Sequence, residues 1–204
     1  YNPTLTLQYK SLRLNFFRRL NELNEQQLNS FLRPSSYKPD YVQRVTTSGR
    51  SVVVWGCITS QGLRTLFRIQ GNFTADKCCD LLENVALPQV TSDIFHDDFI
   101  FQQDKSPIHT SKKARKLLEN KGVTVLEWPL RSPHINIIEN VWGIIKATLA
   151  RHGIHGASAK TPWKAVQDEW KRLRMDKTLT DELYESLPQR MRDVLNGNGD
   201  FTCY

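Results

Sequence analysis

Cysteine is scarce in this sequence, and the spacing of the few cysteines excludes two common classes of small domain. The chain has 204 residues and four cysteines, namely Cys57, Cys78, Cys79 and Cys203. They fit neither a disulfide framework nor the ligand spacing of a zinc site. We therefore expect buried thiols and a reducing compartment.

The sequence also lacks several signals that would indicate another class of protein. It contains no apolar run long enough to span a membrane, no signal peptide, no internal repeat and no low-complexity tract. We therefore expect no membrane partner. At this length, one domain with a substantial core is the expected organisation.

Acidic residues are scarce relative to basic ones, and the imbalance is concentrated in two segments. The net charge is +7 and the isoelectric point is about 9.3. Residues 1–50 contain eight Lys or Arg and three acids, and residues 105–121 contain six Lys or Arg and one acid. Such a surplus favours a polyanionic partner such as nucleic acid, although a basic run can also be a solvated surface.

Two acidic residues at the ends of one α/β unit are the strongest functional signal. Asp104 ends an apolar run, FIFQQD, and Glu139 lies in IIEN at the start of a helical pattern, with 34 residues between them. The intervening residues predict a basic helix at 109–120 and a strand at 123–127. Such a unit can bring both carboxylates to one edge of a sheet, where oxygen ligands suit Mg²⁺ or Mn²⁺. Taken singly, Asp104 could be a turn residue, and Glu139 could be favoured by the helix dipole.

Two sequence blocks around these acids resemble one protein family. QQDKSPIHTS, which contains Asp104, resembles the QQDN-x-P-x-HTS block of mariner-superfamily DDE transposases. SPHINIIENVW, which contains Glu139, resembles their SPDLNPIENLW block, and the separation of the two acids is the one that family uses. VWG before a hairpin and the ending LYESLPQRMRDVLNGNGDFTCY are further similarities. The resemblance covers about residues 36–204 and implies a complete C-terminal end.

This resemblance implies a fold, a chemistry and a set of site residues. The implied fold is an α/β domain with an RNase H-like mixed sheet flanked by helices and a helical C-terminal extension. The implied function is DNA cleavage and strand transfer in the nucleus, with DNA as the partner, a homodimer as one assembly, and three carboxylates holding two Mg²⁺ or Mn²⁺ ions. Asp104 and Glu139 would be two of these catalytic metal ligands. The residues expected at DNA phosphates are Lys105, His109, Lys112, Lys113 and Lys116, although His109 could instead cap the following helix.

The sequence departs from the family's pattern within both blocks. Lys105 stands where the family has Asn, and its positive charge beside a metal ligand should weaken cation binding. His134 replaces an Asp, and Ile137 replaces a Pro. The family's DNA-reading helix-turn-helix domains are not found in this sequence either.

The largest departure is the absence of the first acid. The family's SDES-like block upstream of VWG is missing, and no Asp precedes Asp40, which falls in a segment resembling the family's linker. Family spacing points to Asn15, which would ligate a cation poorly and is a good helix N-cap. We therefore divide the chain into an atypical segment, 1–35, and a DDE-type domain, 36–204, and expect impaired catalysis. The alternatives are a non-catalytic DNA-binding or protein-interaction domain, and an active nuclease that recruits a substitute acid.

The remaining pattern predicts the order of the elements. Alternating residues in 5–16 predict strand structure that fills the vacant central position of the sheet, and a helix follows that stops before Pro34. Residues 35–50 predict a linker, and residues 152–160 predict a mobile link. Strands are expected at 51–59 and 63–69. A helix capped by Asn72 or Thr74 is expected to run through Leu87 and to end at Pro88, and further helices are expected at 137–151, 162–174 and 179–195.

Overall fold

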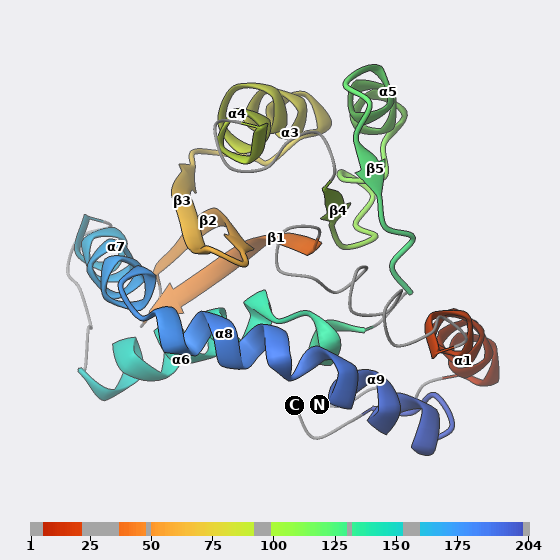
Figure 1. Ribbon diagram of the computed structural model, residues 1–204. Helices are drawn as coiled ribbons and strands as arrows, with labels where there is room; N and C mark the ends of the chain where they lie inside the picture. Colours follow the sequence, from red (N-terminus) through yellow and green to blue (C-terminus); the bar gives the residue numbers. More distant parts are fainter. Residues whose placement is uncertain are drawn as a thin grey trace.

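The described part of the chain is a mixed sheet flanked by helices, as predicted (Figure 1). The computed structural model describes residues 6–21, 37–47, 50–91, 99–129, 132–152 and 160–201. The strands are β1 (Tyr37–Thr47), β2 (Arg50–Thr59), β3 (Gly62–Ile69), β4 (Ile100–Gln102) and β5 (Thr124–Val125). The helices are α1 (Leu7–Asn21), α3 (Ala75–Leu81), the π-helical turn η1 (Leu82–Ala86), α4 (Leu87–Thr91), α5 (Lys112–Asn120), the 3₁₀ turn η2 (Pro133–Ile135), α6 (Ile138–Arg151), α7 (Lys160–Arg174), α8 (Lys177–Glu185) and α9 (Leu187–Asn196). None of these helices is long and apolar enough to cross a membrane.

The strand order of the sheet is β3-β2-β1-β4-β5, so β1 is central. β1 pairs with β2 in antiparallel orientation and with β4 in parallel orientation. β2 and β3 form the expected hairpin, and β5 extends the sheet in parallel with β4. The carboxyl end of β4 therefore lies beside the central strand, two residues before Asp104.

Two apolar cores lie on opposite faces of this sheet. Alternate residues of β2 divide between them, because successive strand residues point to opposite faces. One core joins β2 and β4 to α3 and α5 through Trp55, Cys57, Cys78, Leu81, Phe101 and Leu118. The other joins β2 to α6, α7, α8 and α9 through Val52, Val54, Ile58, Val141, Trp142, Ile145, Val166, Trp170, Leu183 and Met191. These helices lie on the two sides of the sheet in Figure 1.

The predicted source of the central strand is wrong. Residues 7–21 form helix α1, not a strand, and Asn15 lies inside this helix rather than at its N-cap. The segment LQYKSLRLNFFRRLN contains no β-branched residue and many Leu, Lys, Arg and Gln residues, which favour a helix. The central position is occupied instead by residues 37–47, which were predicted to be a linker. Tyr, Val and Thr are frequent in that segment and are favourable in strands.

Two predicted helix ends also differ from the structure. Thr74 accepts a hydrogen bond from the Lys77 amide as the predicted N-cap, but the helix continues through Pro88 to Thr91 after the π-helical turn. The single helix predicted at 179–195 is two helices, α8 and α9, and Pro188 lies in the first turn of α9, where a missing N–H is tolerated. The predicted link at 152–160 lies almost entirely outside the described residues.

Close contact between β2 and two tryptophans fixes α6 and α7 against the sheet. The rings of Trp142 and Trp170 stack with centroids 5.0 Å apart, and Trp170 Nε1 donates a hydrogen bond to the Arg64 carbonyl at 2.8 Å. A Cβ atom added to Gly56 would lie 2.5 Å from Trp170 Cη2 and 3.1 Å from Trp142 Cη2. The glycine of the VWG motif is therefore required by packing.

Replacing Gly56 with Ala should destabilise the protein by about 1–3 kcal/mol, because overpacking forces the tryptophans or the strand to shift. The matched control is Gly143→Ala in α6, where an added Cβ meets no atom within 4 Å. That control should be neutral or stabilising by up to about 1 kcal/mol. Urea unfolding of the three proteins measures both effects, and equal stability of Gly56→Ala and the unaltered protein would contradict this packing argument.

Candidate functional site

Asp104 lies in the turn between β4 and α5, with one carboxylate oxygen engaged by its own loop. Asp104 Oδ1 lies 2.6 Å from His109 Nδ1 and accepts a hydrogen bond from the Ser106 amide at 3.0 Å. Burial opposes ionisation of this carboxyl, but the His109 and Ser106 hydrogen bonds outweigh it and lower the pKa of Asp104. Asp104 is therefore ionised at neutral pH, and its side chain is 32% exposed, so a ligand can reach it.

Glu139 is the second residue of α6 and has the opposite electrostatic character. Burial raises its pKa to about 7, the charge of Lys146 opposes this shift, and the charge of Asp104 adds to it. The two carboxyls therefore lie within electrostatic range of each other. Glu139 Oε1 is buried and has no hydrogen-bond partner among the described residues. The side chain borders a pocket of about 410 Å³ that is lined by His134, Glu139, Asn140, Gly143, Ile144 and Ala147.

The backbone register of the central strand shows which of its positions share a face with α6. β1 pairs Asp40 with Cys57 and Tyr41 with Gly56. Cys57 belongs to the core beneath α3 and α5, whereas Gly56 faces the tryptophans of α6 and α7. Because paired residues share a face, position 40 belongs to the face away from α6 and position 41 to the face of α6. The parallel register ends at the pair Pro39 and Gln102, and if it continued by two residues it would bring position 41 level with Asp104.

The chemistry of these donors fits one divalent cation better than two. A partly exposed, ionised carboxylate and a buried carboxylate oxygen without a described partner are suitable ligands for Mg²⁺ or Mn²⁺. Among the described side chains, however, no group of three acids, histidines or cysteines is close enough to hold a metal. Asn15 lies on the exposed side of α1, and Glu22 and Glu25 lie outside the described residues.

His109 is a neighbour of the site rather than a surface residue. Its side chain is 3% exposed, bonds to Asp104, and packs edge-to-face against Phe73 with ring centroids 6.0 Å apart. The phosphate contact by His109 stays a prediction, and the burial of the ring argues against it. The alternative role as a helix cap is wrong, since Ser111 caps α5 by accepting a hydrogen bond from the Ala114 amide. His109 instead orients the Asp104 carboxylate.

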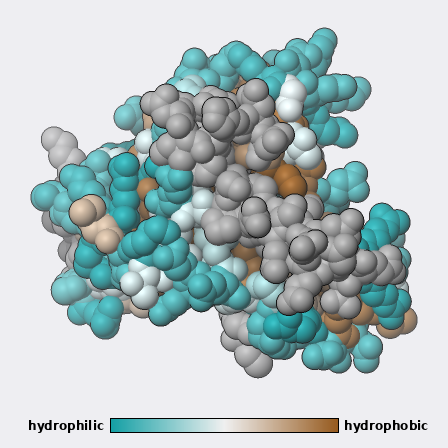
Figure 2. Space-filling view, viewed as in Figure 1, coloured by the Kyte–Doolittle hydropathy of each residue, from teal (hydrophilic) through white to brown (hydrophobic). Residues whose placement is uncertain are grey.

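The predicted basic residues are exposed on and before α5, but they differ in their partners. Lys113 Nζ lies 2.5 Å from Asp76 Oδ1, and Lys121 Nζ lies 2.8 Å from Glu83 Oε1. These two lysines are thus paired with acids of the neighbouring helices α3 and η1. Lys112 and Lys116 share a face of α5 with Arg115, a residue that the sequence analysis did not select. The surface over α5, at the upper right of Figure 2, is accordingly hydrophilic.

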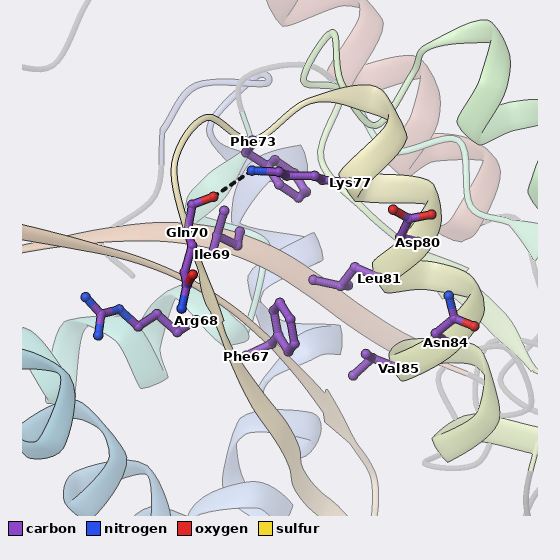
Figure 3. A pocket seen from close by; sticks show the side chains of 10 residues that line it. All are labelled: Phe67, Arg68, Ile69, Gln70, Phe73, Lys77, Asp80, Leu81, Asn84 and Val85. Carbon is purple, nitrogen blue, oxygen red and sulfur yellow. Dashed lines mark hydrogen bonds between the residues drawn. The ribbon is translucent and has the colours of Figure 1, made fainter.

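A larger groove lies between β3 and α3, apart from the two acids. It has a volume of about 510 Å³, and apolar side chains from β3, α3 and η1 point into it, as Figure 3 shows for Phe67, Leu81 and Val85. Lys77 Nζ donates a hydrogen bond to the Gln70 carbonyl at 2.6 Å at one end. Neither Asp104 nor Glu139 lines this groove. It shares with the site only Phe73, which packs against His109.

His134, the residue before α6 that replaces an acid of the resembling block, is buried beside two arginines. Arg13 Nη2 from α1 lies 2.6 Å from His134 Nε2, and Arg190 Nη1 from α9 donates a hydrogen bond to the His134 carbonyl at 3.0 Å. Burial, reinforced by both arginine charges, lowers the pKa of His134 to about 4. Sequence reasoning missed both arginines, because nothing local in α1 or α9 indicates that they meet at this loop.

Comparisons with known proteins show which family and which relatives this chain resembles. Residues 24–161 match the sequence profile of a family described as DDE superfamily endonuclease. The chain is 33% identical over 171 residues to the Tc1 transposase of Caenorhabditis elegans and 33% identical over 171 residues to the Tcb2 transposase of Caenorhabditis briggsae. These alignments cover 83% and 82% of this chain but 61% and 60% of the relatives, so the chain spans about three fifths of their length.

Solved structures support the predicted fold class. The crystal structure of the catalytic domain of Mos1 mariner transposase superposes with a TM-score of 0.80 over 99% of both chains, at 15% sequence identity. The Mos1 paired-end complex with the left transposon end gives a TM-score of 0.82 over 98% of this chain and 66% of that chain, at 14% identity. The RNase H-like fold of the described residues is therefore confirmed.

Lowering the pH should destabilise the protein through His134. Its pKa is about 4 in the folded chain against 6.5 without perturbation, so the unfolded chain binds more protons between these values. The stabilising contribution of neutral His134 is therefore fully present above about pH 6.5 and is lost as the pH falls towards 4. The loss should be about 1–3 kcal/mol, since one pKa unit corresponds to about 1.4 kcal/mol.

Urea unfolding of the unaltered protein and of His134→Gln, at pH 7 and pH 4.5, measures this contribution. Glu139 has a raised pKa and so contributes the opposite slope, but it does so in both proteins and cancels in the difference. Identical pH profiles for the two proteins would show that His134 is not held neutral by the fold.

Proposed function

Because residues 24–161 match its profile, the chain belongs to the DDE superfamily of endonucleases, and we propose that it is a Tc1/mariner transposase-derived domain that binds DNA but does not cut it. The observation that carries the proposal is the backbone register of β1, in which position 41, a Tyr, and not position 40, an Asp, shares a face with Gly56 and α6. The family match and the two acids Asp104 and Glu139 support descent from a nuclease that cleaves and joins DNA. The Tyr, rather than an Asp, at the β1 position that shares the face of α6 supports the loss of that chemistry.

The residues of the proposed site would hold one Mg²⁺ or Mn²⁺ ion weakly. The Asp104 carboxylate and Glu139 Oε1 are the donors, with His109 and Ser106 fixing the orientation of Asp104. A divalent cation, when bound, supplies a polarised water and stabilises a leaving phosphate oxygen, and nucleases of this kind use two such ions. Exposed Lys105 follows Asp104 directly, and its charge opposes cation binding.

DNA is the partner that the charge distribution supports. Lys105, Lys112, Arg115 and Lys116 are exposed next to the site and lie at the start of α5, so a phosphate backbone along this helix would pass the two acids. Contacts of this kind position a duplex without reading its bases. We propose binding without sequence preference in the nucleus, and a homodimer as the assembly on DNA. The Mos1 paired-end complex with the left transposon end, which has this fold, supports DNA as the partner.

The second candidate function is an active nuclease with a substitute acid. Asp40 is the acid that favours this alternative, because β1 carries it one residue beyond the last β1–β4 pair. Its position belongs to the face of Cys57, away from α6, which argues against this role. A nicking assay separates the two functions.

We expect no nicking of supercoiled plasmid by the unaltered protein, with Mg²⁺ or Mn²⁺, above the level of an Asp104→Ala control. The physical reason is the missing third donor, since loss of one preorganised group in an active site costs about 10²–10³ in rate. Tyr41→Asp places an acid at the β1 position that shares the face of α6, so it is the variant expected to restore nicking.

Asp40→Asn completes the nicking experiment as the test of the substitute acid. Nicking by the unaltered protein that disappears in both Asp104→Ala and Asp40→Asn would establish the active nuclease and overturn the proposal. Nicking that survives Asp104→Ala would instead indicate a contaminating nuclease, because both candidate functions require the Asp104 carboxylate as a metal ligand.

Duplex DNA should bind without sequence preference, and its affinity should fall steeply with salt, because phosphate contacts release counterions. Changing Lys112, Arg115 and Lys116 together to Ala should reduce the slope of log affinity against log salt by about two to three, since each phosphate contact contributes about 0.9. Fluorescence anisotropy of a labelled duplex at several salt concentrations measures this slope.

The matched control for DNA binding is the double variant Lys113→Ala, Lys121→Ala. It removes two positive charges from the same helix region, but these charges are already paired with Asp76 and Glu83. Its salt slope should stay close to that of the unaltered protein. A control that lowers the slope as much as the triple variant would mean that the face of Lys112 and Lys116 is not the DNA surface.

A further inference from the structure

The start of α6, which carries Glu139, has no side-chain cap of its own. The N-cap residue, Ile137, has no polar side chain, and the Glu139 amide donates to the Asn136 carbonyl at 3.0 Å. The position of the first turn therefore depends on the loop 132–137 that precedes it. Asn136 and His134 in this loop are buried, so contacts with other parts of the protein hold the loop in place.

Arg190 of α9 connects this loop to the first turn of α6. Its side chain is 3% exposed, and Nη1 donates to the His134 carbonyl at 3.0 Å and to Asn140 Oδ1 at 2.8 Å. Its Nε donates to Ser186 Oγ at 2.8 Å, which fixes the guanidinium relative to α9. Asn140 follows Glu139 directly. One planar guanidinium thus holds both the loop and the residue beside the acid.

Arg13 of α1 holds the same loop from the other side. Its side chain is fully buried, and Nη2 contacts His134 Nε2 at 2.6 Å and donates to the Asp200 carbonyl at 3.0 Å. The guanidinium carbon lies 5.3 Å from the centre of the Phe201 ring. Two buried guanidinium groups, from the first and last described helices, therefore meet at His134.

We propose that Arg190 is a positioning residue for Glu139, with Arg13 supporting the loop from the opposite side. Burying a guanidinium is costly unless its donors are used, and Arg190 uses its donors on the segment that carries Glu139. Removing Arg190 frees both the His134 carbonyl and the Asn140 side chain, so the first turn of α6 is no longer fixed relative to Asp104. This inference rests on the proposed function, because it assumes that Asp104 and Glu139 hold a cation together.

The test is the affinity for Mn²⁺, measured by electron paramagnetic resonance on the full chain, with thermal unfolding recorded in parallel. Arg190→Met should weaken Mn²⁺ binding about tenfold, the size of effect that groups orienting metal ligands have. The matched control is Arg192→Met in the same helix. Arg192 is exposed and, among the contacts described, bonds only to Gln189 and not to the loop. Its Mn²⁺ affinity should be unchanged.

Two further variants keep the inference falsifiable if Arg190→Met does not fold. Asn140→Ala removes only the contact between Arg190 and α6, and it should weaken Mn²⁺ binding while leaving the loop contact in place. Arg190→Lys should restore part of the affinity, because an ammonium can reach one of the two acceptors. Unchanged Mn²⁺ affinity in Asn140→Ala or Arg190→Met would overturn the positioning role.

The proposed function fails in a different way from this inference. No Mn²⁺ binding by the unaltered protein, or equal binding by Asp104→Ala, would show that the two acids hold no cation and would end both. Binding that depends on Asp104 but not on Arg190 would leave the proposed site intact and remove only the inference.

Discussion

The central strand of this sheet must have both of its edges paired, and the positions of the other elements follow from that requirement. β1 pairs with β2 along most of its length and with β4 at its start. A buried backbone N–H or C=O without a partner costs about 1–3 kcal/mol, so an empty central position would destabilise several residues at once. Residues 37–47 satisfy this requirement, and by pairing with β4 they also fix the turn that carries Asp104.

Completing the sheet restores the fold without restoring the chemistry. Backbone hydrogen bonds need no particular side chain, whereas a metal site needs an acid on one face at one level of the strand. By backbone register, position 40 shares the face of Cys57, and position 41 shares the face of Gly56 and α6. A shift of one residue in register would exchange the faces of positions 40 and 41. A single residue therefore separates an arrangement with an acid on the face of α6 from one without.

The two remaining acids are held by different kinds of support. Asp104 is oriented within its own loop by His109 and Ser106, so its placement is a local property of QQDKSPIHTS. Glu139 lies on a helix whose first turn is held by Arg190, far away in sequence. The opposite pKa shifts of the two acids follow from this difference, since Asp104 has donors for its charge and Glu139 is mainly buried.

The sequence by itself determined the two acids, their separation, the hairpin of β2 and β3, most helices and the family, because these depend on local period and on two long matched blocks. It did not determine which segment becomes the central strand. The alternation in 5–16 was a weak local signal, and the choice was made by long-range pairing of 37–47 with two strands. The burial of His109 and the meeting of Arg13 with Arg190 were likewise decided only by tertiary structure. A contact between residues more than a hundred positions apart, such as Arg13 with His134, produces no periodic pattern in either segment. It therefore cannot be predicted from the local sequence.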